Sequence, residues 1–458
     1  MPKRMTSAAL NFGSRLKQLR EEAGMSLRRL GKEVHCSHGF LWDLENGTKR
    51  PSAAVARLLD DVLKAGGELS ALLGEASADV SRRTAVDKSE TIGVRVGLDF
   101  VPEWQDGIEN AVELWRGDLN RRGFLRAASF EAAVFLSPAM RWLMSPLDER
   151  PAGGGEMLVG MPDVETVQQI TATYRRLDNR FGGGHVREGI VRFLSDEVAV
   201  RIGGKYDIST GRQLLSAAAE ATQLAAWSSY DAGMHGLAQR YMIQALRLAA
   251  GAGDRALGAE ILAAMSHQAA YNGAHVEAVD LARAAGRAAV EAGVAAIQAE
   301  SAVLEAQGYA VGGDSASCAS ALSRAEVIFD KADRASDPQW IGYFDEAYLA
   351  AKFGQCFAAL GRGEIAQRFA ARSLDMDGGE YARGRQFNLA LSAIAHAQVG
   401  EIEQSAHIGM QAADAADGLT SMRSRDYLLD IANKLSKHVG LPSVRDYMER
   451  VRPIVERL

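Results

Sequence analysis

Residues 37–50 read SHGFLWDLENGTKR, and Pro51 follows directly. Ser37 is a suitable cap for a short helix, and Gly47 ends that helix because glycine tolerates the left-handed backbone at a helix C-terminus. A hydroxyl and two cations then come together in one loop, formed by Thr48, Lys49 and Arg50. A short helix followed by such a loop is typical of proteins that contact the phosphates of nucleic acid.

Other short helices are predicted around this stretch, over 14–23, over 27–35 with Ser26 as its cap, and from Pro51 onward. The apolar positions at helical spacing, which we expect to form one small core, are Leu16, Leu19, Leu27, Leu30, Val34, Leu41, Leu44, Val55, Leu58, Leu59 and Val62. The positions left facing outward on the helix over 38–46 are His38, Gly39, Trp42 and Asp43.

Two short helices joined by a tight turn, the second with polar groups outward, form the helix-turn-helix arrangement. The residues here closely resemble its phage-repressor, or Xre/Cro, type. The motifs that carry the resemblance are LKQLREEAGMS (16–26), LRRLGKEV (27–34) and the spacing of Ser37, Leu41, Glu45, Gly47, Arg50 and Pro51. The resemblance implies a five-helix DNA-binding domain over residues 1–68.

The resemblance also implies which residues contact double-stranded DNA: Arg28, Ser37, His38, Gly39, Trp42, Asp43, Thr48, Lys49 and Arg50. The first turns of the third helix would read bases, and the loop and Arg28 would hold phosphates. Gly39 has no side chain, so its role is close approach or none, whereas Asp43 could accept from cytosine N4 or adenine N6. Trp42 has three possible interpretations: it contacts the sugar–phosphate backbone, it packs against the rest of the protein, or it is partly exposed. The alternative to DNA binding is that this N-terminal domain is retained only for dimer contacts.

Length and composition favour a multidomain, all-α chain. The 458 residues are 47% hydrophobic but only 7% aromatic, and they contain ten prolines. The three cysteines lie far apart, and no apolar run reaches the roughly 18 residues that a membrane span needs, so we expect a cytoplasmic protein without metal, cofactor or membrane contact. Residues 1–68 hold 12 Lys/Arg against 8 Asp/Glu, although the chain carries –6. A basic head on an acidic body is the polarity expected when one end binds nucleic acid.

The next segments are predicted as a linker over 69–100 and a helical connector over 101–160. The stretch NRRGFLRAA (120–128) imitates a twin-arginine export signal, but it lies far from the N-terminus and Glu131 interrupts the apolar part. We expect a structural helix there, capped by Asp118 or Asn120. Its buried residues would be Phe124, Leu125, Ala128 and Phe130.

From residue 207 glycines recur at matching turns: Gly233, Gly273, Gly313, Gly361, Gly400 and, more weakly, Gly440. The intervals are 40, 40, 48, 39 and 40 residues, with small residues five and twelve positions after most of these glycines. This pattern predicts stacked helical hairpins over 161–458, with an earlier pair over 163–202. The spacing resembles the tetratricopeptide repeat, and HEAT-like pairing is the alternative. The phrase TYRRLDNRFGGGHV (172–186) lacks nucleotide-binding spacing and is interpreted as a helix end and a bend.

In the tetratricopeptide repeat the first helix of each unit lines a concave face. The residues that this implies for a ligand site are Trp227, Tyr230, His267, Tyr271, Gln307, Gln355, Arg176 and Arg180. Glu220, Glu260 and Glu300, each 40 positions apart, form an acidic stripe that either meets a peptide or small cationic molecule or simply stays solvated.

With both features, the whole chain resembles transcription regulators of actinobacterial, Streptomyces-like type, in which a helix-turn-helix domain precedes helical repeats. Such proteins control development and secondary metabolism, and related regulators respond to peptides or small molecules. We therefore expect a homodimer on an inverted-repeat operator. No catalytic motif stands out, so no enzyme is expected. Two alternative functions remain: a protein-binding scaffold with a vestigial DNA-binding domain, and an exported protein.

Overall fold

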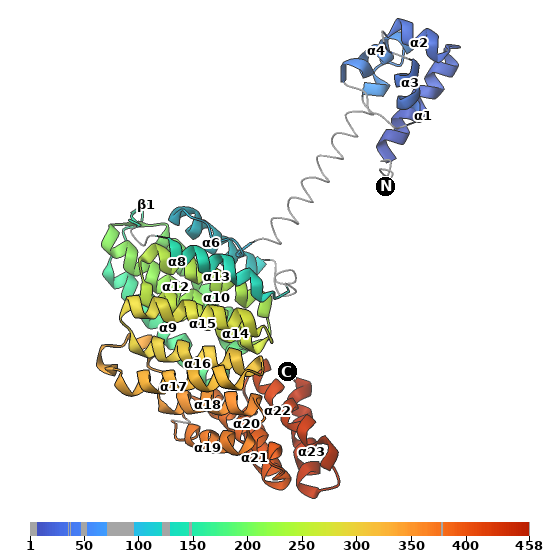
Figure 1. Cartoon of the computed structure of the whole chain (residues 1–458). Coiled ribbons are helices and arrows are strands. Elements are labelled where there is room, and N and C mark those ends of the chain that lie inside the picture. The colour runs from blue at the N-terminus through green and yellow to red at the C-terminus, as the bar shows by residue number, and fades with distance from the viewer. Residues whose placement is uncertain are drawn as a thin grey trace. The chain divides into compact units, whose positions relative to one another are not determined.

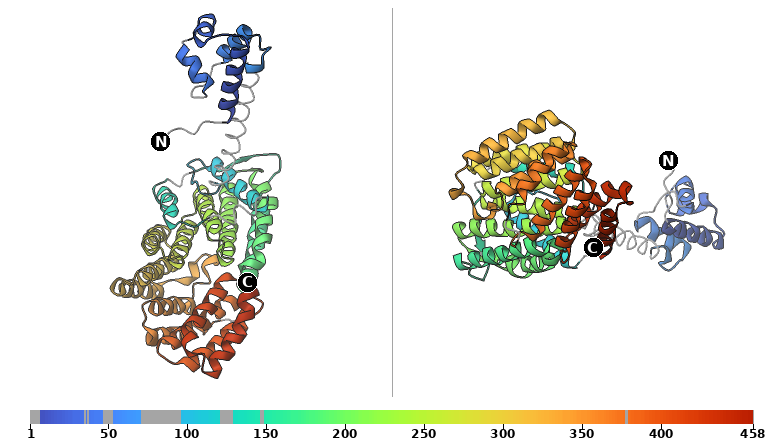
Figure 2. Two further views of the ribbon diagram at one scale, coloured as in Figure 1. Left: turned by 90° about the vertical axis from the view of Figure 1, so that its right-hand side faces the viewer. Right: turned by 90° about the horizontal axis from the view of Figure 1, so that it is seen from below.

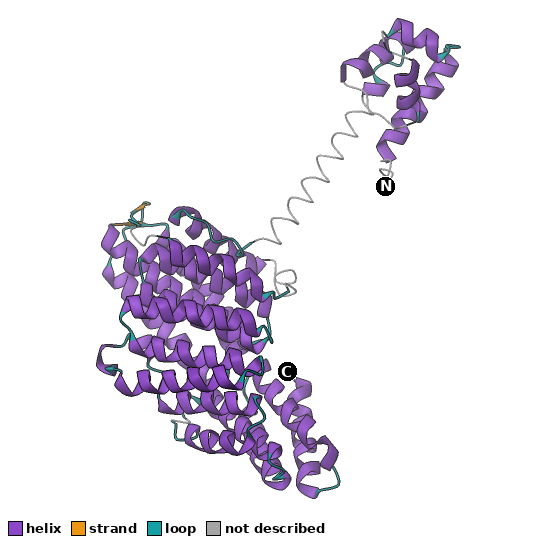
Figure 3. Cartoon of the chain, in the orientation of Figure 1, coloured by secondary structure: helices purple, strands orange, loops and turns teal. Residues whose placement is uncertain are grey.

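The computed structural model describes residues 7–34, 36, 38–46, 53–70, 96–120, 129–145, 149–376 and 379–457. Two units, Met1–Val94 and Arg95–Leu458, make their contacts internally, and each is described by itself (Figure 1). Both are helical, which confirms the predicted all-α class, and strands are confined to one two-stranded pair in the described ranges (Figure 3).

The first unit contains α1 (Ser7–Glu22), α2 (Leu27–Glu33), α3 (His38–Glu45) and α4 (Ala53–Leu63), and a further helix begins at Glu68. Ser26 caps α2 as predicted, because its hydroxyl accepts from the backbone N–H of Arg29 at 3.3 Å. The centre of the core is made of fully buried leucines from all four helices: Leu16, Leu30, Leu41, Leu44 and Leu59.

The prediction was wrong for Leu58, whose side chain is 43% exposed. On α4 the positions that face the core are Ala56, Leu59 and Leu63, spaced three and four residues apart. Leu58 lies one position before Leu59, about 100° away around the helix, and therefore faces outward. The prediction also placed the start of the first helix seven residues late, because α1 already begins at Ser7.

The second unit begins with helices that pack on the repeats. α6 (Trp104–Asn120) lies on α13 and α10, and η1 (Ala132–Phe135) with α8 (Leu136–Met144) lies against α13 and α15. Asp118 is not a helix cap, contrary to the prediction, because α6 continues through it to Asn120. The buried Asp118 carboxylate instead accepts from the guanidinium of Arg187 at 2.5 and 3.0 Å. Of the expected apolar residues, Phe130 is partly buried, and Phe124, Leu125 and Ala128 lie outside the described residues.

The body is a stack of antiparallel helix pairs, as predicted. A first pair, α9 (Met161–Phe181) and α10 (Gly183–Phe193), continues through a π turn η2 (Leu194–Val198) into α11 (Ala199–Ile202). Strands β1 (Gly153–Gly154) and β2 (Lys205–Tyr206) pair antiparallel beside it. The later pairs are α12 (Ile208–Asp231) with α13 (His235–Ala252), α14 (Arg255–Tyr271) with α15 (His275–Ala292), α16 (Ala295–Val311) with α17 (Ser315–Lys331), α18 (Glu346–Ala359) with α19 (Gly363–Ser373), α20 (Ala382–Gln398) with α21 (Ile402–Ala416), and α22 (Met422–Leu435) with α23 (Pro442–Arg457).

Glycines in the left-handed conformation mark the turns of these pairs. Five predicted turn glycines have φ between 70° and 84°: Gly233, Gly273, Gly313, Gly361 and Gly400. Gly440, the weak sixth, does not adopt a positive φ. Gly253 and Gly293, with φ of 72° and 74°, end the second helices α13 and α15. The turn therefore recurs every 20 residues from Gly233 to Gly313, at half the predicted interval.

The stack also closes on itself. The loop before α22 meets the turn between α9 and α10, where the N–H of Thr420 donates to the carbonyl of Phe181 at 2.8 Å and the N–H of Gly184 donates to the carbonyl of Thr420 at 2.9 Å. Figure 2 shows the red C-terminal helices beside the green helices of the first pair. The concave side is therefore bounded by both ends of the stack. Within the described ranges, no helix combines the length and apolarity that crossing a bilayer requires.

Candidate nucleic-acid interface and ligand cavity

The turn between α2 and α3 is tight enough to require glycine on one side. A Cβ added at Gly31 would lie 2.6 Å from the carbonyl oxygen of Cys36, far inside van der Waals contact. At Gly13 an added Cβ would lie 2.5 Å from the carbonyl oxygen of Leu44, so α1 crosses the end of α3 backbone to backbone. These close approaches fix the orientation of α3 relative to α1 and α2.

An ion pair holds the same three segments together. Arg20 on α1 donates to both carboxylate oxygens of Glu45 on α3, at 2.5 and 3.0 Å, and to the carbonyl of Met25 at 2.9 Å. The two side chains are only 12% and 5% exposed, so this pair is buried more than a surface salt bridge. Both residues belong to the motifs that carry the resemblance, Arg20 within LKQLREEAGMS (16–26) and Glu45 in the spacing along the third helix, but no sequence signal showed that they pair.

The face of α3 that the sequence assigned to DNA is exposed. His38 and Gly39 are exposed in the first turn, Trp42 is 54% exposed, and Asp43 is half-buried. Arg28 is exposed in the first turn of α2. Trp42 thus does not pack in the core of its own unit. Ser37, Thr48, Lys49 and Arg50 lie outside the described residues.

The body encloses a cavity of about 340 Å³. It is lined by α9, α12, α14, α18, α20, α22 and the segment between α17 and α18. The lining residues are Arg175, Asp178, Asn179, Leu224, Trp227, Glu260, His267, Gln339, Trp340, Gly342, Tyr343, Asp345, Ala347, Tyr348, Ala351, Lys352, Gln355, Met376, Tyr381, Arg383, Gly384, Phe387, Asn388 and Arg423. Three of the ligand residues expected from sequence, Trp227, His267 and Gln355, are among them.

The other expected ligand residues do not line the cavity. Tyr230 is fully buried beneath it, and the Tyr271 hydroxyl donates to Asp426 at 2.7 Å. Gln307 lies behind the lining residues, where its Oε1 accepts from the Lys352 amine at 3.2 Å.

Arg176 and Arg180 are exposed on α9, because the cavity-facing arginine of that helix is Arg175, one position earlier.

A basic cluster of His267, Lys352 and Arg423 converges at one end of the cavity. The Lys352 Nζ lies 2.7 Å from Nδ1 of His267, and both side chains are almost fully buried. Burial, and then the nearby charge of Arg423, lower the pKa of Lys352 to about 7. Burial, and then the charge of Lys352, lower the pKa of His267 well below its usual value.

A pair of carboxyl groups lies at another side of the cavity. Glu260 and Glu300 are each 3% exposed, so the alternative that this part of the acidic stripe stays solvated is wrong. The Tyr343 hydroxyl lies 2.7 Å from Oε1 of Glu260 and 2.9 Å from Oε1 of Glu300. Burial raises the pKa of both carboxyl groups, and the charge of Glu300 raises that of Glu260 further. Glu220, the third member, accepts from Arg175 at 2.9 Å.

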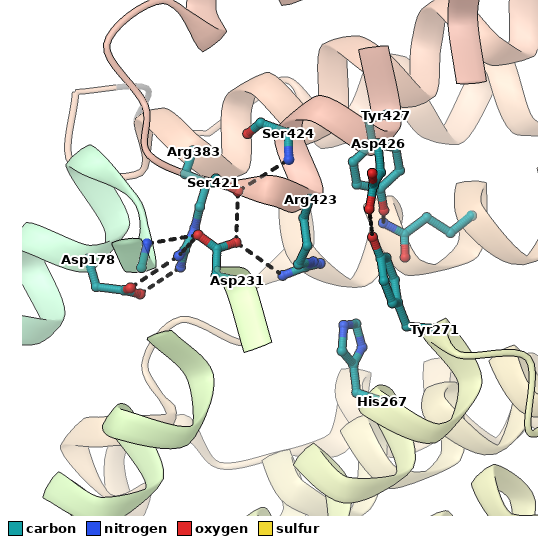
Figure 4. Close-up of polar contacts among 12 residues, drawn as sticks. Asp178, Asp231, His267, Tyr271, Arg383, Ser421, Arg423, Ser424, Asp426 and Tyr427 are labelled. Carbon is teal, nitrogen blue, oxygen red and sulfur yellow. Dashed lines mark hydrogen bonds and ion pairs between the residues drawn. The ribbon is translucent and has the colours of Figure 1, made fainter. Parts of the chain in front are cut away.

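A polar network closes the ring of helices next to the cavity (Figure 4). Arg383 on α20 pairs with Asp178 of α9 at 2.7 Å and with Asp231 of α12 at 3.1 Å. Asp231 also accepts from the Ser421 hydroxyl at 2.9 Å, and its other oxygen accepts from the N–H of Gly183 at 2.8 Å. Four segments far apart in sequence are thereby joined around one carboxylate.

One feature of the sequence could have predicted a part of the cavity wall that the expected ligand residues do not include. The interval from Gly313 to Gly361 is 48 residues, whereas its neighbours are 40 and 39 residues. The extra length forms the segment between α17 and α18, with η3 (Arg334–Ser336) and η4 (Gln339–Ile341), which supplies Trp340 and Tyr343. Lys352 and Arg423 had no comparable signal. Among the described residues, no group of His, Cys, Asp and Glu could hold a metal ion.

A family model described as a helix-turn-helix domain matches residues 11–73 of the chain. The match lies within the first unit. It begins inside α1 and includes α2 to α4 and the predicted DNA-contacting loop. No curated protein matches the sequence. The N-terminal unit is therefore a helix-turn-helix domain of the kind found in DNA-binding regulators.

Proposed function

We propose that this chain is a sequence-specific, DNA-binding transcription regulator of the Xre/Cro type whose helical-repeat body senses a small molecule. The helix-turn-helix match at residues 11–73 is the observation that carries the proposal. The exposed face of α3, with His38 and Trp42, supports major-groove reading. The proposal assigns the chain no enzymatic activity and places it in the cytoplasm.

The enclosed cavity supports the sensing part of the proposal. Its volume of about 340 Å³ falls at the lower end of the roughly 300–1,000 Å³ of small-molecule sites. Such a space suits a small molecule better than an extended peptide. We also propose that the helix pairs are tetratricopeptide-like repeats. From the sequence resemblance, we propose that the chain is an actinobacterial regulator of development or secondary metabolism.

An exposed apolar stripe supports a homodimer. α8 places Leu136, Met140 and Met144 on one face at intervals of four residues, with exposed fractions of 38%, 60% and 77%. A homodimer of a helix-turn-helix protein presents two recognition helices to half-sites about 34 Å apart on an inverted repeat. Met140→Lys is the matching test, because a charge in the stripe should shift the mass measured by light scattering toward the monomer.

α22 connects the cavity wall to the closure of the ring. This helix carries Arg423 in the cavity wall and begins directly after Ser421, which closes the ring on Asp231. A ligand that engages Arg423 would change how α22 sits against α9 and α12. A coupling of about 1–3 kcal/mol between ligand and DNA is enough for regulation.

Selection of genomic fragments by the purified chain, followed by footprinting, tests the proposed function. A defined, symmetric protected site supports it. A scaffold with a vestigial head would enrich no site, and that result would replace the regulator with the rival function. A gel shift with the gene's own upstream DNA is the most direct first experiment.

A further inference from the structure

The cavity contains more positive charge than its own carboxylates neutralise. Four of its lining residues are cations, and two of these are paired. Arg175 donates to Glu220 at 2.9 Å, and Arg383 pairs with Asp178 and Asp231 at 2.7 and 3.1 Å. These two arginines therefore act within the fold.

Lys352 has no such partner, and Arg423 has only a long contact to a carboxylate that already pairs with Arg383. Among the described residues, no carboxylate lies within ion-pair distance of Lys352, whose polar neighbours are His267 and Gln307. The nearest carboxylate to Arg423 is that of Asp231, at 4.0 Å. Both residues are buried, at 4% and 9% exposed. Buried charges without close counterions are costly, so they indicate a partner that enters the cavity.

The guanidinium of Arg423 is held in place without hydrogen bonds. Its Cζ lies 4.7 Å from the ring centroid of Tyr230 and 4.6 Å from that of Phe387, so two aromatic faces fix its plane. Its buried Nε finds no acceptor among the described residues. Stacking fixes the plane of the guanidinium and leaves its donors for an oxyanion, which it can bind through two hydrogen bonds.

The remaining wall is largely aromatic. Trp227, Trp340, Tyr348 and Phe387 line the cavity, and Ala347 and Ala351 leave space between them. Flat apolar side chains around a small volume favour a planar, apolar ligand body. The carboxyl group of Glu260 tends to keep its proton and so repels an anion less than an ionised group would.

We propose that the cavity binds a small organic anion with an aromatic or other planar apolar body, whose carboxylate or sulfonate is held between Lys352 and Arg423. The inference rests on the proposed function in one respect only, since it takes this cavity as the signal-binding site. The lowered pKa of Lys352, about 7, agrees with it, because burial and Arg423 disfavour an ammonium that an anion would restore.

Two fluorescent probes that differ only in a sulfonate test the charge requirement. The probes are 8-anilinonaphthalene-1-sulfonate and N-phenyl-1-naphthylamine, titrated into the full chain at pH 7. Lys352→Met and Arg423→Gln should each weaken binding of the sulfonate about tenfold or more, the usual effect of losing a charge-assisted hydrogen bond. Neither change should move the affinity for the uncharged probe by more than about twofold.

Two further variants control the result. Ala351→Phe fills the cavity and should remove the binding of both probes, whereas Lys331→Met, at the exposed end of α17, should affect neither. Circular dichroism confirms that each variant is folded, and Lys352→Met and Arg423→Gln test the charge independently. The inference is overturned if both charge variants retain the parent's affinity for the sulfonate. It is also overturned if Ala351→Phe leaves sulfonate binding intact.

Probe binding and DNA binding are measured separately, so the two proposals can fail separately. A charge-dependent probe site without any selected DNA site would leave an anion-binding protein that is not a regulator. A selected DNA site with no charge-dependent probe binding would leave a regulator whose signal is not an organic anion.

Discussion

The guanidinium of Arg383 donates two hydrogen bonds to the carboxylate of Asp178, at 2.7 and 3.2 Å, although 205 positions separate the two residues. This contact joins α20 to α9 and closes the ring of helix pairs around the cavity. It acts beside the hydrogen bonds of Thr420 with Phe181 and Gly184, which join the same ends of the stack.

Arg383→Met should lower the free energy of unfolding of the body by about 3 kcal/mol or more, because it leaves buried carboxylates without a counterion. Denaturant unfolding followed by circular dichroism measures the change. Arg372→Met is the matched control, since the Arg372–Glu346 pair is 53% and 74% exposed and should contribute less than about 1 kcal/mol. Similar losses in both variants would show that ring closure adds no stability.

Lys352→Met should stabilise the protein at pH 7 by about 1–3 kcal/mol, because a buried cation without a carboxylate partner is removed. The folded pKa of Lys352, about 7, lies below the roughly 10.4 of an unfolded lysine. Between these values the unfolded chain binds the extra proton, so the parent gains stability as pH rises. The difference between variant and parent should therefore shrink by up to about 1.4 kcal/mol per pH unit above 7.

Unfolding at several pH values between 7 and 10, with parent and variant side by side, measures this difference. Titrating groups remote from Lys352 act equally on both proteins and cancel in the comparison. The groups that face Lys352 and are linked to its proton are His267 on α14, Glu300 on α16, Arg423 on α22, and Tyr348 and Cys356 on its own helix. A difference that stays constant with pH would mean that Lys352 keeps an ordinary pKa.

Arg50→Ala should weaken binding to all DNA sequences alike and reduce the salt slope by about one. Asp43→Ala should instead change the preference at one base pair, because a carboxylate accepts from cytosine N4 or adenine N6. Binding to a library of operator variants at two salt concentrations separates the two effects. An equal loss on every sequence for Asp43→Ala would remove it from base reading.

Asp60→Ala should destabilise the helix-turn-helix domain by about 1–3 kcal/mol. Its buried carboxylate accepts from the backbone N–H of Leu69 at 2.8 Å and from that of Ser70 at 2.9 Å, and it therefore caps the helix after α4. Asp61→Ala, at the exposed neighbouring position, is the control. Hydrogen exchange of the full chain, measured on peptides from the first unit, should show loss of protection only for Asp60→Ala.

Gly258→Ala should destabilise the body by about 1–3 kcal/mol through overpacking. An added Cβ would lie 2.1 Å from Cζ2 of Trp142, which packs flat on α14 at this point. Gly286→Ala on α15 would meet nothing closer than 3.5 Å, so it should be neutral or stabilising by the gain in helix propensity. Thermal unfolding of both variants measures the difference. Equal melting temperatures would contradict a close contact between Trp142 and α14 at Gly258.

Much of the fold follows from local sequence. Helical spacing of leucines and the Ser26 cap predicted the small core of the first unit, and Leu58 failed because neighbouring leucines do not tell which of two adjacent positions faces inward. Turn glycines from Gly233 to Gly400 predicted the stacked pairs, since a left-handed turn requires a residue without a side chain. These signals span only a few residues, so they need no knowledge of the rest of the chain.

Local patterns along the chain predicted most of the helices, their pairing and the helix-turn-helix domain. The closure of the stack into a ring, and the cavity lined by Lys352 and Arg423, follow only from how the helix pairs pack. The physical reason is that small rotations between successive pairs add up along the stack, so contacts such as Arg383–Asp178 depend on every unit in between. Arg423 and His267 come from helices more than 150 positions apart, and no local pattern records that they meet.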